Sequence, residues 1–326
     1  NWNNQKDSMA LILANDGIHP AGKAVLESAG FEVRTEKVAQ NELAAFIKSE
    51  NVAAVLVRSA TQITEKELTV STSLKVIGRA GVGLDNIDLK SAETNGVAVV
   101  NTPAASSQSV AELVLVHLFT VSRFLQLSNR EMPVSGTSEF GKLKKSYSKG
   151  VELQGKTLGI VGIGRIGQAL AKMALGLGMK VVAHDPFIPE VGISFDVHIY
   201  GEVSVKLTTT SLDDILAQSD FISLHVPKPK EGALIGQAEF SKTKDGLIIV
   251  NASRGGVIDE DALLAALESG KVAAAGLDVF ENEPSPRQDL LDHPRISVTP
   301  HIGASTNEAQ TRIGIELAEK VISAIG

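Results

Sequence analysis

Short apolar runs alternate with amphipathic segments along this chain from Met9 onward. The apolar runs have the length of β-strands, and the segments between them repeat their apolar positions at helical spacing. This alternation is typical of βαβ units and predicts a parallel sheet covered by helices. In the first third of the chain we predict strands at residues 10–14, 31–35, 53–58, 76–79 and 97–101, and helices near 20–29, 41–49, 64–70 and 86–94.

The same alternation starts again near Val151 and predicts a second α/β unit. Its strands are expected at residues 158–162, 180–184, 221–226, 247–252, 273–278 and 296–299, with a short β excursion over 190–209. Between the units we predict a long apolar helix over 109–127 and a connecting arm or loop over 132–150, which is rich in Ser, Gly and Lys. An amphipathic helix over 307–325 could cross back to the first unit. The economical interpretation is two doubly wound, Rossmann or flavodoxin-like domains with a cleft between them.

A dinucleotide-binding fingerprint opens the second unit. An apolar strand leads into Gly162-x-Gly164-x-x-Gly167, and a helix and a second apolar strand ending at Asp185 follow. The first glycine makes a tight turn, the second lets backbone approach a pyrophosphate, and the third lets helix and strand pack closely. A carboxylate at Asp185 would bind the adenosine ribose and repel a 2′-phosphate, which favours NAD over NADP.

Composition and charge narrow the classes of partner. A length of 326 residues suggests about two domains, and 43% hydrophobic residues can fill sizeable cores. A net charge of −7 argues against a nucleic-acid or anionic-membrane surface. The chain has no cysteine, which excludes disulfides and thiol catalysis, and no apolar stretch suited to spanning a bilayer. We expect a cytoplasmic protein, with residues 1–8 as a leader or tag.

Three polar residues follow predicted strands of the second unit: Arg254, Glu283 and His301. The carboxyl edge of an open parallel sheet is where ligands bind. Reduction of a 2-oxo acid needs a hydride at carbon and a proton on oxygen, and His301 could supply the proton. Glu283 would stabilise the imidazolium, and Arg254 could grip the carboxylate and polarise the carbonyl. A lone histidine after Thr-Pro is more often structural, so the catalytic interpretation depends on all three residues together.

In the first unit, two cations stand at neighbouring strand ends, Arg58 and Arg79. Gly81 and Gly83 flank Val82 and could form a backbone nest for a carboxylate. A single arginine is usually a solvated surface charge, whereas two at adjacent strand ends suggest a doubly charged substrate. Of the other histidines, His225 is expected to border the cofactor and His117 to be packed in the core. No His, Asp or Glu cluster has metal-ligand spacing, so no metal is predicted.

The chain resembles the D-isomer-specific 2-hydroxyacid dehydrogenases from Met9 to its end. The segments GRAGVGLDNIDLKSA, LGIVGIGRIGQALA, VNASRGGVIDEDALLAAL, GLDVFENEP and TPHIGASTNEAQ fit the family pattern in order. The resemblance implies a substrate domain over 9–107 plus 300–326, an NAD domain over 108–299, and a homodimer formed through 109–127 and 132–150. It also implies that Arg254, Glu283 and His301 are the catalytic set.

Within the family, VRSAT, GRAGVGLDNID and PHIGAST are most similar to the phosphoglycerate dehydrogenase branch. That resemblance implies oxidation of 3-phosphoglycerate to 3-phosphohydroxypyruvate, the first step of phosphorylated serine biosynthesis. It places substrate contacts at Arg58, Ser59, Arg79, Val82, Gly83, Ser106 and Lys145. It places NAD contacts at Gly162, Gly164, Arg165, Ile166, Gly167, Asp185, His225, Val226, Pro227, Ala252, Ser253, Arg254, Asp278, His301 and Gly303.

Two departures from the family pattern bear on these expectations. Ser106 stands where relatives carry a substrate-binding Asn, and the chain stops at Gly326, so we expect no C-terminal regulatory domain and no serine feedback. One alternative is a glyoxylate, hydroxypyruvate or other D-2-hydroxyacid reductase, which needs the same three catalytic residues but fewer cations. A remote alternative is an NAD-sensing corepressor-like binding protein.

Overall fold

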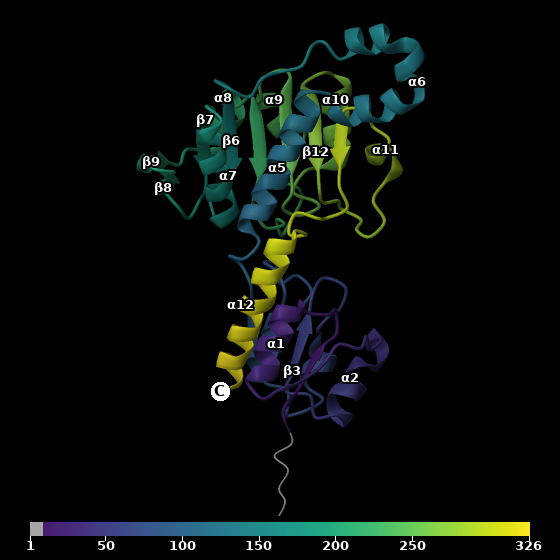
Figure 1. The fold of residues 1–326 in the computed structure, drawn as a ribbon, viewed down its shortest axis with the longest axis vertical. Helices are drawn as coiled ribbons and strands as arrows, with labels where there is room; N and C mark the ends of the chain where they lie inside the picture. The colour runs from purple at the N-terminus through teal and green to yellow at the C-terminus, as the bar shows by residue number, and fades with distance from the viewer. Residues whose placement is uncertain (1–8) are drawn as a thin grey trace, which may run out of the picture. The chain divides into compact units, whose positions relative to one another are not determined.

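The computed structural model describes residues 9–326, apart from the side chain of Val197, so the predicted leader over 1–8 lies outside the described residues. The chain divides into two compact units, one formed by residues up to Ser106 together with Ala304–Gly326, and the other by Ser107–Gly303. The boundaries expected from the sequence were 107/108 and 299/300. Each unit contains a parallel sheet with helices on both faces, as predicted (Figure 1).

The first unit contains a five-stranded parallel sheet in the order β2-β1-β3-β4-β5. The strands are β1 (Leu11–Ala14), β2 (Glu32–Arg34), β3 (Ala54–Val57), β4 (Val76–Arg79) and β5 (Ala98–Asn101). The helices are α1 (Pro20–Ser28), α2 (Gln40–Ser49), α3 (Glu65–Leu68), α4 (Leu89–Thr94) and α12 (Asn307–Ile325). The reversal of strand order between β1 and β3 is that of a flavodoxin-like sheet.

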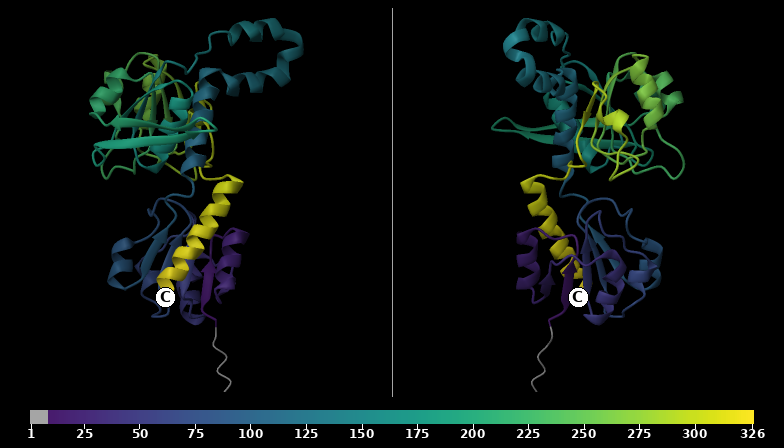
Figure 2. Two further views of the ribbon diagram at one scale, coloured as in Figure 1. Left: turned by 60° about the vertical axis from the view of Figure 1, so that its left-hand side comes forward. Right: turned by 90° about the vertical axis from the view of Figure 1, so that its right-hand side faces the viewer.

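Alternation along the strands gives this sheet two apolar faces. On β1, Leu11 and Leu13 pack with residues of α2, whereas Ile12 and Ala14 pack with residues of α1 and α12. Helices α1 and α12 lie side by side (Figures 1 and 2). A Cβ on Gly22 would stand 2.3 Å from the carbonyl oxygen of Gly314, so the two backbones meet directly at this crossing. The predicted return of the final helix to the first unit is therefore confirmed.

The second unit contains a six-stranded parallel sheet in the order β13-β12-β11-β10-β6-β7. Its strands are β6 (Thr157–Val161), β7 (Lys180–His184), β10 (Phe221–Leu224), β11 (Leu247–Asn251), β12 (Val272–Leu277) and β13 (Ile296–Val298). The predicted β excursion is an antiparallel pair, β8 (Glu190–Val197) and β9 (Gly201–Thr208), seen beside the sheet in Figure 1.

Two apolar clusters cover the faces of the second sheet. The helices of this unit are α5 (Ser107–Ser122), α6 (Leu125–Ser146), α7 (Arg165–Gly176), α8 (Leu212–Gln218), α9 (Gln237–Lys242), α10 (Glu260–Glu268) and α11 (Gln288–Leu291). Residues of α5 and α7 share one cluster with alternate strand positions. Residues of α8, α9 and α10 share the other. Sequential βα units on both faces place the carboxyl ends of all six strands at one edge.

The region between the units differs from its prediction. The apolar helix ends at Ser122, not near 127, because Phe124 adopts a left-handed conformation with φ of 56°. The segment 132–150 was expected to be an arm or loop, but Leu125–Ser146 is helical with a non-helical break at Glu139. Neither Gly nor Pro marks the break after Ser122, and good helix formers such as Glu, Leu and Lys outweigh the Ser and Gly content of α6. Among residues 9–326, no single helix is long and apolar enough to cross a membrane; α5 and α6 pass only as a pair bent by 58°.

Candidate active site

The fingerprint loop has the geometry that its glycines predict. Gly162 has φ of 94°, and a Cβ there would stand 2.4 Å from the carbonyl oxygen of His225. A Cβ on Gly167 would stand 2.3 Å from the carbonyl oxygen of Gly162. By contrast, a Cβ on Gly164 would meet nothing within 4 Å, and no side chain caps α7 at this residue. The first N–H groups of α7 therefore face open space, which fits the pyrophosphate of a dinucleotide.

Asp185 stands directly after β7, where the sequence predicts a ribose-binding carboxylate. Its Oδ2 accepts the backbone N–H of Ile163 at 3.0 Å, and its Oδ1 accepts those of Phe187 at 2.9 Å and Ile188 at 3.2 Å. The carboxylate thus also ties the end of β7 to the fingerprint loop. Arg165 and Ile166 occupy the first turn of α7, with Arg165 exposed.

The remaining predicted cofactor residues follow four neighbouring strands at the same edge. They are Val226 and Pro227 after β10, Ala252 and Ser253 after β11, Asp278 after β12 and Gly303 after β13. His225, also after β10, shares a hydrogen bond with Ser223 Oγ at 2.9 Å. Burial lowers the pKa of His225 to about 4, so its imidazole is neutral at physiological pH. Its buried Nδ1 has no hydrogen-bond partner among the described residues.

The predicted catalytic residues lie on loops that leave three adjacent strands. Arg254 follows β11, Glu283 follows β12 and His301 follows β13. His301 Nδ1 and Glu283 Oε2 are 2.8 Å apart. Partial burial opposes ionisation of Glu283, but the hydrogen bond and charge of His301, with a contribution from Arg254, hold its pKa below the usual value. The structure therefore brings all three together.

A cavity of about 380 Å³ borders the Glu283–His301 pair. Apart from this pair and Thr299, its lining is apolar: Phe280, Pro284, Pro286, Leu291, Val298 and Pro300. Water is largely displaced from that side of the pair, and a low-dielectric surface strengthens the interaction between carboxylate and imidazole.

Backbone contacts position the loop that carries Arg254. Asn251 Oδ1 accepts the N–H of Ser253 at 3.0 Å and its hydroxyl at 2.7 Å, and Asn251 Nδ2 donates to the carbonyl of Arg254 at 2.9 Å. A Cβ on Gly255 would stand 1.9 Å from the carbonyl oxygen of Phe280. Only glycine lets this loop lie directly on the backbone that leads to Glu283. Asn251 was missed in the sequence, although Asn at a strand end is a turn signal.

A buried network positions the loop that carries His301. The Asp278 carboxylate accepts the hydroxyl of Thr299 at 2.6 Å and the N–H groups of Ile302 at 2.8 Å and Gly303 at 2.9 Å. Thr299 in turn shares a hydrogen bond with His117 Nε2 at 3.0 Å. Burial lowers the pKa of His117, which is packed in the core as predicted. The sequence offered no signal for the role of Thr299.

In the first unit, Arg58 and Arg79 stand at the carboxyl ends of the paired strands β3 and β4. Arg58 is partly buried, and Ser59 after it is exposed. Arg79 Nη1 would stand 1.5 Å from a Cβ on Gly81, so the glycine makes room for the guanidinium. Its neighbours Val82 and Gly83 are exposed and partly exposed.

Two further predicted substrate residues have other surroundings. The hydroxyl of Ser106 is buried without a hydrogen-bond partner among the described residues. Lys145 is exposed on α6, and Figure 1 places α6 at the opposite edge of the second sheet from the carboxyl ends of its strands. The structure therefore does not bring Lys145 together with Arg254, Glu283 and His301 within one chain. The prediction failed because the segment is a helix and not the flexible arm expected.

Known proteins share both the sequence and the fold. Residues 115–303 match the sequence model of the D-isomer specific 2-hydroxyacid dehydrogenase, NAD binding domain. A hydroxypyruvate reductase of Thermotoga maritima is 43% identical over 310 residues, which cover 94% of this chain and 95% of that protein. This chain belongs to the D-isomer specific 2-hydroxyacid dehydrogenases.

Other members of this dehydrogenase family differ in their named substrates. A D-3-phosphoglycerate dehydrogenase of Methanocaldococcus jannaschii is 40% identical over 315 residues, covering 96% of this chain but 57% of that protein. The chain thus spans little more than half the length of that relative. A glyoxylate reductase structure from Paecilomyes thermophila matches with a TM-score of 0.80 at 31% identity, covering 98% of this chain and 95% of that one. Family, fold class and NAD as the cofactor of the domain are confirmed, and this chain is an oxidoreductase of the family.

Proposed function

We propose that this dehydrogenase interconverts 3-phosphoglycerate and 3-phosphohydroxypyruvate with NAD. The observation that carries the proposal is the pair of arginines, Arg58 and Arg79, at adjacent strand ends of the first unit. A substrate with a carboxylate and a phosphate has two anionic groups to neutralise, and planar guanidinium groups bind both kinds. An unphosphorylated 2-hydroxy acid would require fewer cations.

The catalytic residues divide the remaining work. The bound nicotinamide supplies hydride chemistry at C2 of the substrate. Because Nδ1 of His301 faces Glu283, Nε2 is the atom that donates a proton to the carbonyl oxygen during reduction and accepts it back during oxidation. The carboxylate of Glu283 stabilises the imidazolium, as in other histidines oriented by a carboxylate. Arg254 binds the substrate carboxylate and polarises the carbonyl.

The residues that would hold NAD come from three places along one sheet edge. The N-terminus of α7 at Gly164 faces the pyrophosphate, and Asp185 faces the adenosine ribose. The neutral His225 and the ends of β10, β11 and β12 border the nicotinamide half. The negative charge of Asp185 disfavours the 2′-phosphate of NADP.

A second candidate is a hydroxypyruvate or glyoxylate reductase. The 43% identity to a hydroxypyruvate reductase over nearly the full length of both chains favours it. That reaction needs the same three catalytic residues and no phosphate contact.

A single assay separates the candidates: NADH oxidation with phosphohydroxypyruvate, hydroxypyruvate, glyoxylate and pyruvate in parallel, repeated with NADPH. We expect the highest kcat/KM for phosphohydroxypyruvate with NADH. Equal or better turnover of an unphosphorylated acid would assign the chain to the second candidate. No turnover of any 2-oxo acid would leave a binding protein.

The proposal also includes a cytoplasmic homodimer. Helices α5 and α6 expose six large apolar side chains to solvent: Val116, Phe119, Leu125, Met132, Val134 and Phe140. Contiguous exposed apolar side chains are typical of a protein interface. Light scattering on the purified protein should give twice the 34.3 kDa chain mass, whereas a monomer at micromolar concentration would contradict this assembly.

A further inference from the structure

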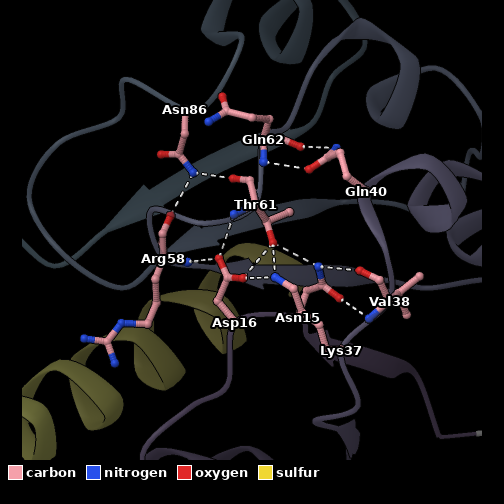
Figure 3. Close-up of polar contacts among 9 residues, drawn as sticks. All are labelled: Asn15, Asp16, Lys37, Val38, Gln40, Arg58, Thr61, Gln62 and Asn86. Carbon is pink, nitrogen blue, oxygen red and sulfur yellow. Dashed lines mark hydrogen bonds and ion pairs between the residues drawn. The ribbon is translucent and has the colours of Figure 1, made fainter. Parts of the chain in front are cut away.

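The tetrapeptide Arg58–Thr61 follows β3 and is held on one side by the carboxylate of Asp16 (Figure 3). Oδ2 of Asp16 accepts the backbone N–H of Arg58 at 2.7 Å and that of Thr61 at 3.1 Å. Oδ1 accepts the Thr61 hydroxyl at 2.7 Å. The Asp16 side chain is only 4% exposed, so these bonds replace water at the carboxylate. Both N–H groups at the ends of the tetrapeptide are thereby fixed to one side chain.

Asn86 holds the same tetrapeptide by its carbonyl groups. Its Nδ2 donates to the carbonyl oxygens of Arg58 at 2.8 Å and Thr61 at 2.6 Å. Asn86 is buried, and it lies three residues beyond Gly83, on the segment that carries the second group of predicted substrate residues. We call Asp16 and Asn86 the clamp. It fixes donors and acceptors at both ends of one short loop.

Two neighbours complete the cluster. Asn15 Nδ2 donates to the Thr61 hydroxyl oxygen at 2.9 Å, and Lys37 Nζ donates to the same oxygen at 2.9 Å. Lys37 also forms an ion pair with Asp16. The ammonium balances a carboxylate that would otherwise oppose binding of an anion near Arg58.

The clamp holds more than the end of a strand. Strand β3 is buried and paired with β1 and β4 without it. The residues between the clamped ends, Ser59 and Ala60, are exposed. In Figure 3 the Arg58 side chain extends away from the cluster, toward the side of α12. Burying a network of polar side chains is favourable only when all of its members are satisfied, and here that network orders an exposed loop.

We propose that Asp16 and Asn86 are positioning residues that hold Arg58 and Ser59 in the conformation that binds the anionic end of the substrate. The proposal rests on the proposed function, because that function assigns substrate binding to Arg58. Neither clamp residue contacts the reacting atoms; both act through the backbone of Arg58–Thr61. Loss of the clamp therefore weakens substrate binding and spares proton transfer in the other unit.

The test compares Asp16→Ala, Asp16→Asn and Asn86→Ala with a matched control, Asp88→Ala. Asp88 is also a carboxylate of the first unit that accepts a backbone N–H, from Ser91 at 2.9 Å, but it caps α4 and does not contact the loop. For each purified protein, kcat and KM are measured with phosphohydroxypyruvate and with hydroxypyruvate, and KM is measured for NADH. Hydrogen exchange of the peptide spanning 58–61 is followed in parallel.

We expect Asp16→Ala and Asn86→Ala to raise KM for phosphohydroxypyruvate by about tenfold or more, with kcat within about threefold and an unchanged KM for NADH. Exchange at 58–61 should accelerate in both. Asp16→Asn keeps one oxygen for the two N–H groups and should restore most of the affinity. If Asp16→Ala matches Asp88→Ala in KM and in exchange, the positioning role is overturned.

Failure of the proposed function has a different signature. Wild-type protein that prefers hydroxypyruvate would contradict the phosphorylated substrate, and the clamp would then be judged by KM for hydroxypyruvate and by exchange. A variant with lower kcat, unchanged KM and slow exchange at 58–61 would also contradict the clamp, because it would indicate a merely structural role.

Discussion

The two units hold the loops at their strand ends by different means. In the second unit, glycines let backbone lie on backbone: a Cβ on Gly255 would stand 1.9 Å from the Phe280 carbonyl, and one on Gly162 would stand 2.4 Å from the His225 carbonyl. In the first unit, buried polar side chains hold the loop after β3, with Asp16 and Asn86 bonded to both of its ends. We infer that the second unit supplies a fixed chemical framework, while the first tunes contact with the substrate.

This difference also separates the kinetic effects expected of substitutions. Groups that act on the transition state change kcat, whereas groups that bind substrate equally in the ground and transition states change KM. Substitutions in the second unit should therefore lower kcat, and those at the clamp should raise KM.

His301→Asn should have the largest effect. Removing the proton donor should lower kcat by about 10²- to 10⁴-fold, since general acid–base catalysis contributes on that order. Steady-state kinetics with saturating NADH measures this loss, and NADH affinity measured by fluorescence titration serves as the control. Retention of more than about a tenth of wild-type kcat would remove His301 from the proton-transfer step.

Gly255→Ala should come next. The added Cβ would collide with the Phe280 carbonyl and displace Arg254, and displacement of a catalytic group by about 1 Å can cost on the order of 10² in rate. Gly192→Ala is a matched control, because a Cβ there meets nothing within 4 Å. Equal kcat/KM for the two variants would show that the Arg254 loop tolerates displacement.

Glu283→Gln tests the charge beside His301. The pKa of Glu283 is lowered, so its carboxylate stays ionised throughout the neutral range and stabilises the protonated imidazole. Removing that charge disfavours the protonated form that reduction needs. The alkaline limb of the kcat/KM profile for reduction should shift to lower pH, with a loss of about tenfold at pH 8. An unshifted limb would contradict this role.

His225→Asn should change activity least at neutral pH but alter stability in acid. The folded pKa of about 4 lies below the ordinary unfolded value, so unfolding takes up a proton between those values. The free energy of unfolding should fall by roughly 1.4 kcal/mol per pH unit from pH 6.5 toward 4. Denaturant unfolding should show a weaker pH dependence in the variant. Parallel curves for variant and wild type would contradict a buried neutral His225.

Sequence reasoning recovered what local pattern encodes. The strand runs, the fingerprint and the order of Arg254, Glu283 and His301 follow from residues close together in the chain, because parallel strands place their carboxyl ends at one edge. The clamp was missed because its bonds join residues far apart, such as Asp16 with Thr61, and no local motif marks them. The end of α5 was missed because Phe124 adopts a left-handed conformation that a non-glycine residue rarely signals.

The most direct test of the account is the ratio of kcat/KM for phosphohydroxypyruvate to that for hydroxypyruvate, in wild-type protein and in Arg58→Gln. If the first unit selects the substrate and the second supplies the chemistry, the substitution should lower this ratio by about tenfold or more, through KM for the phosphorylated acid alone. Turnover of hydroxypyruvate should barely change. An unchanged ratio, or an equal loss with both acids, would contradict that division of roles.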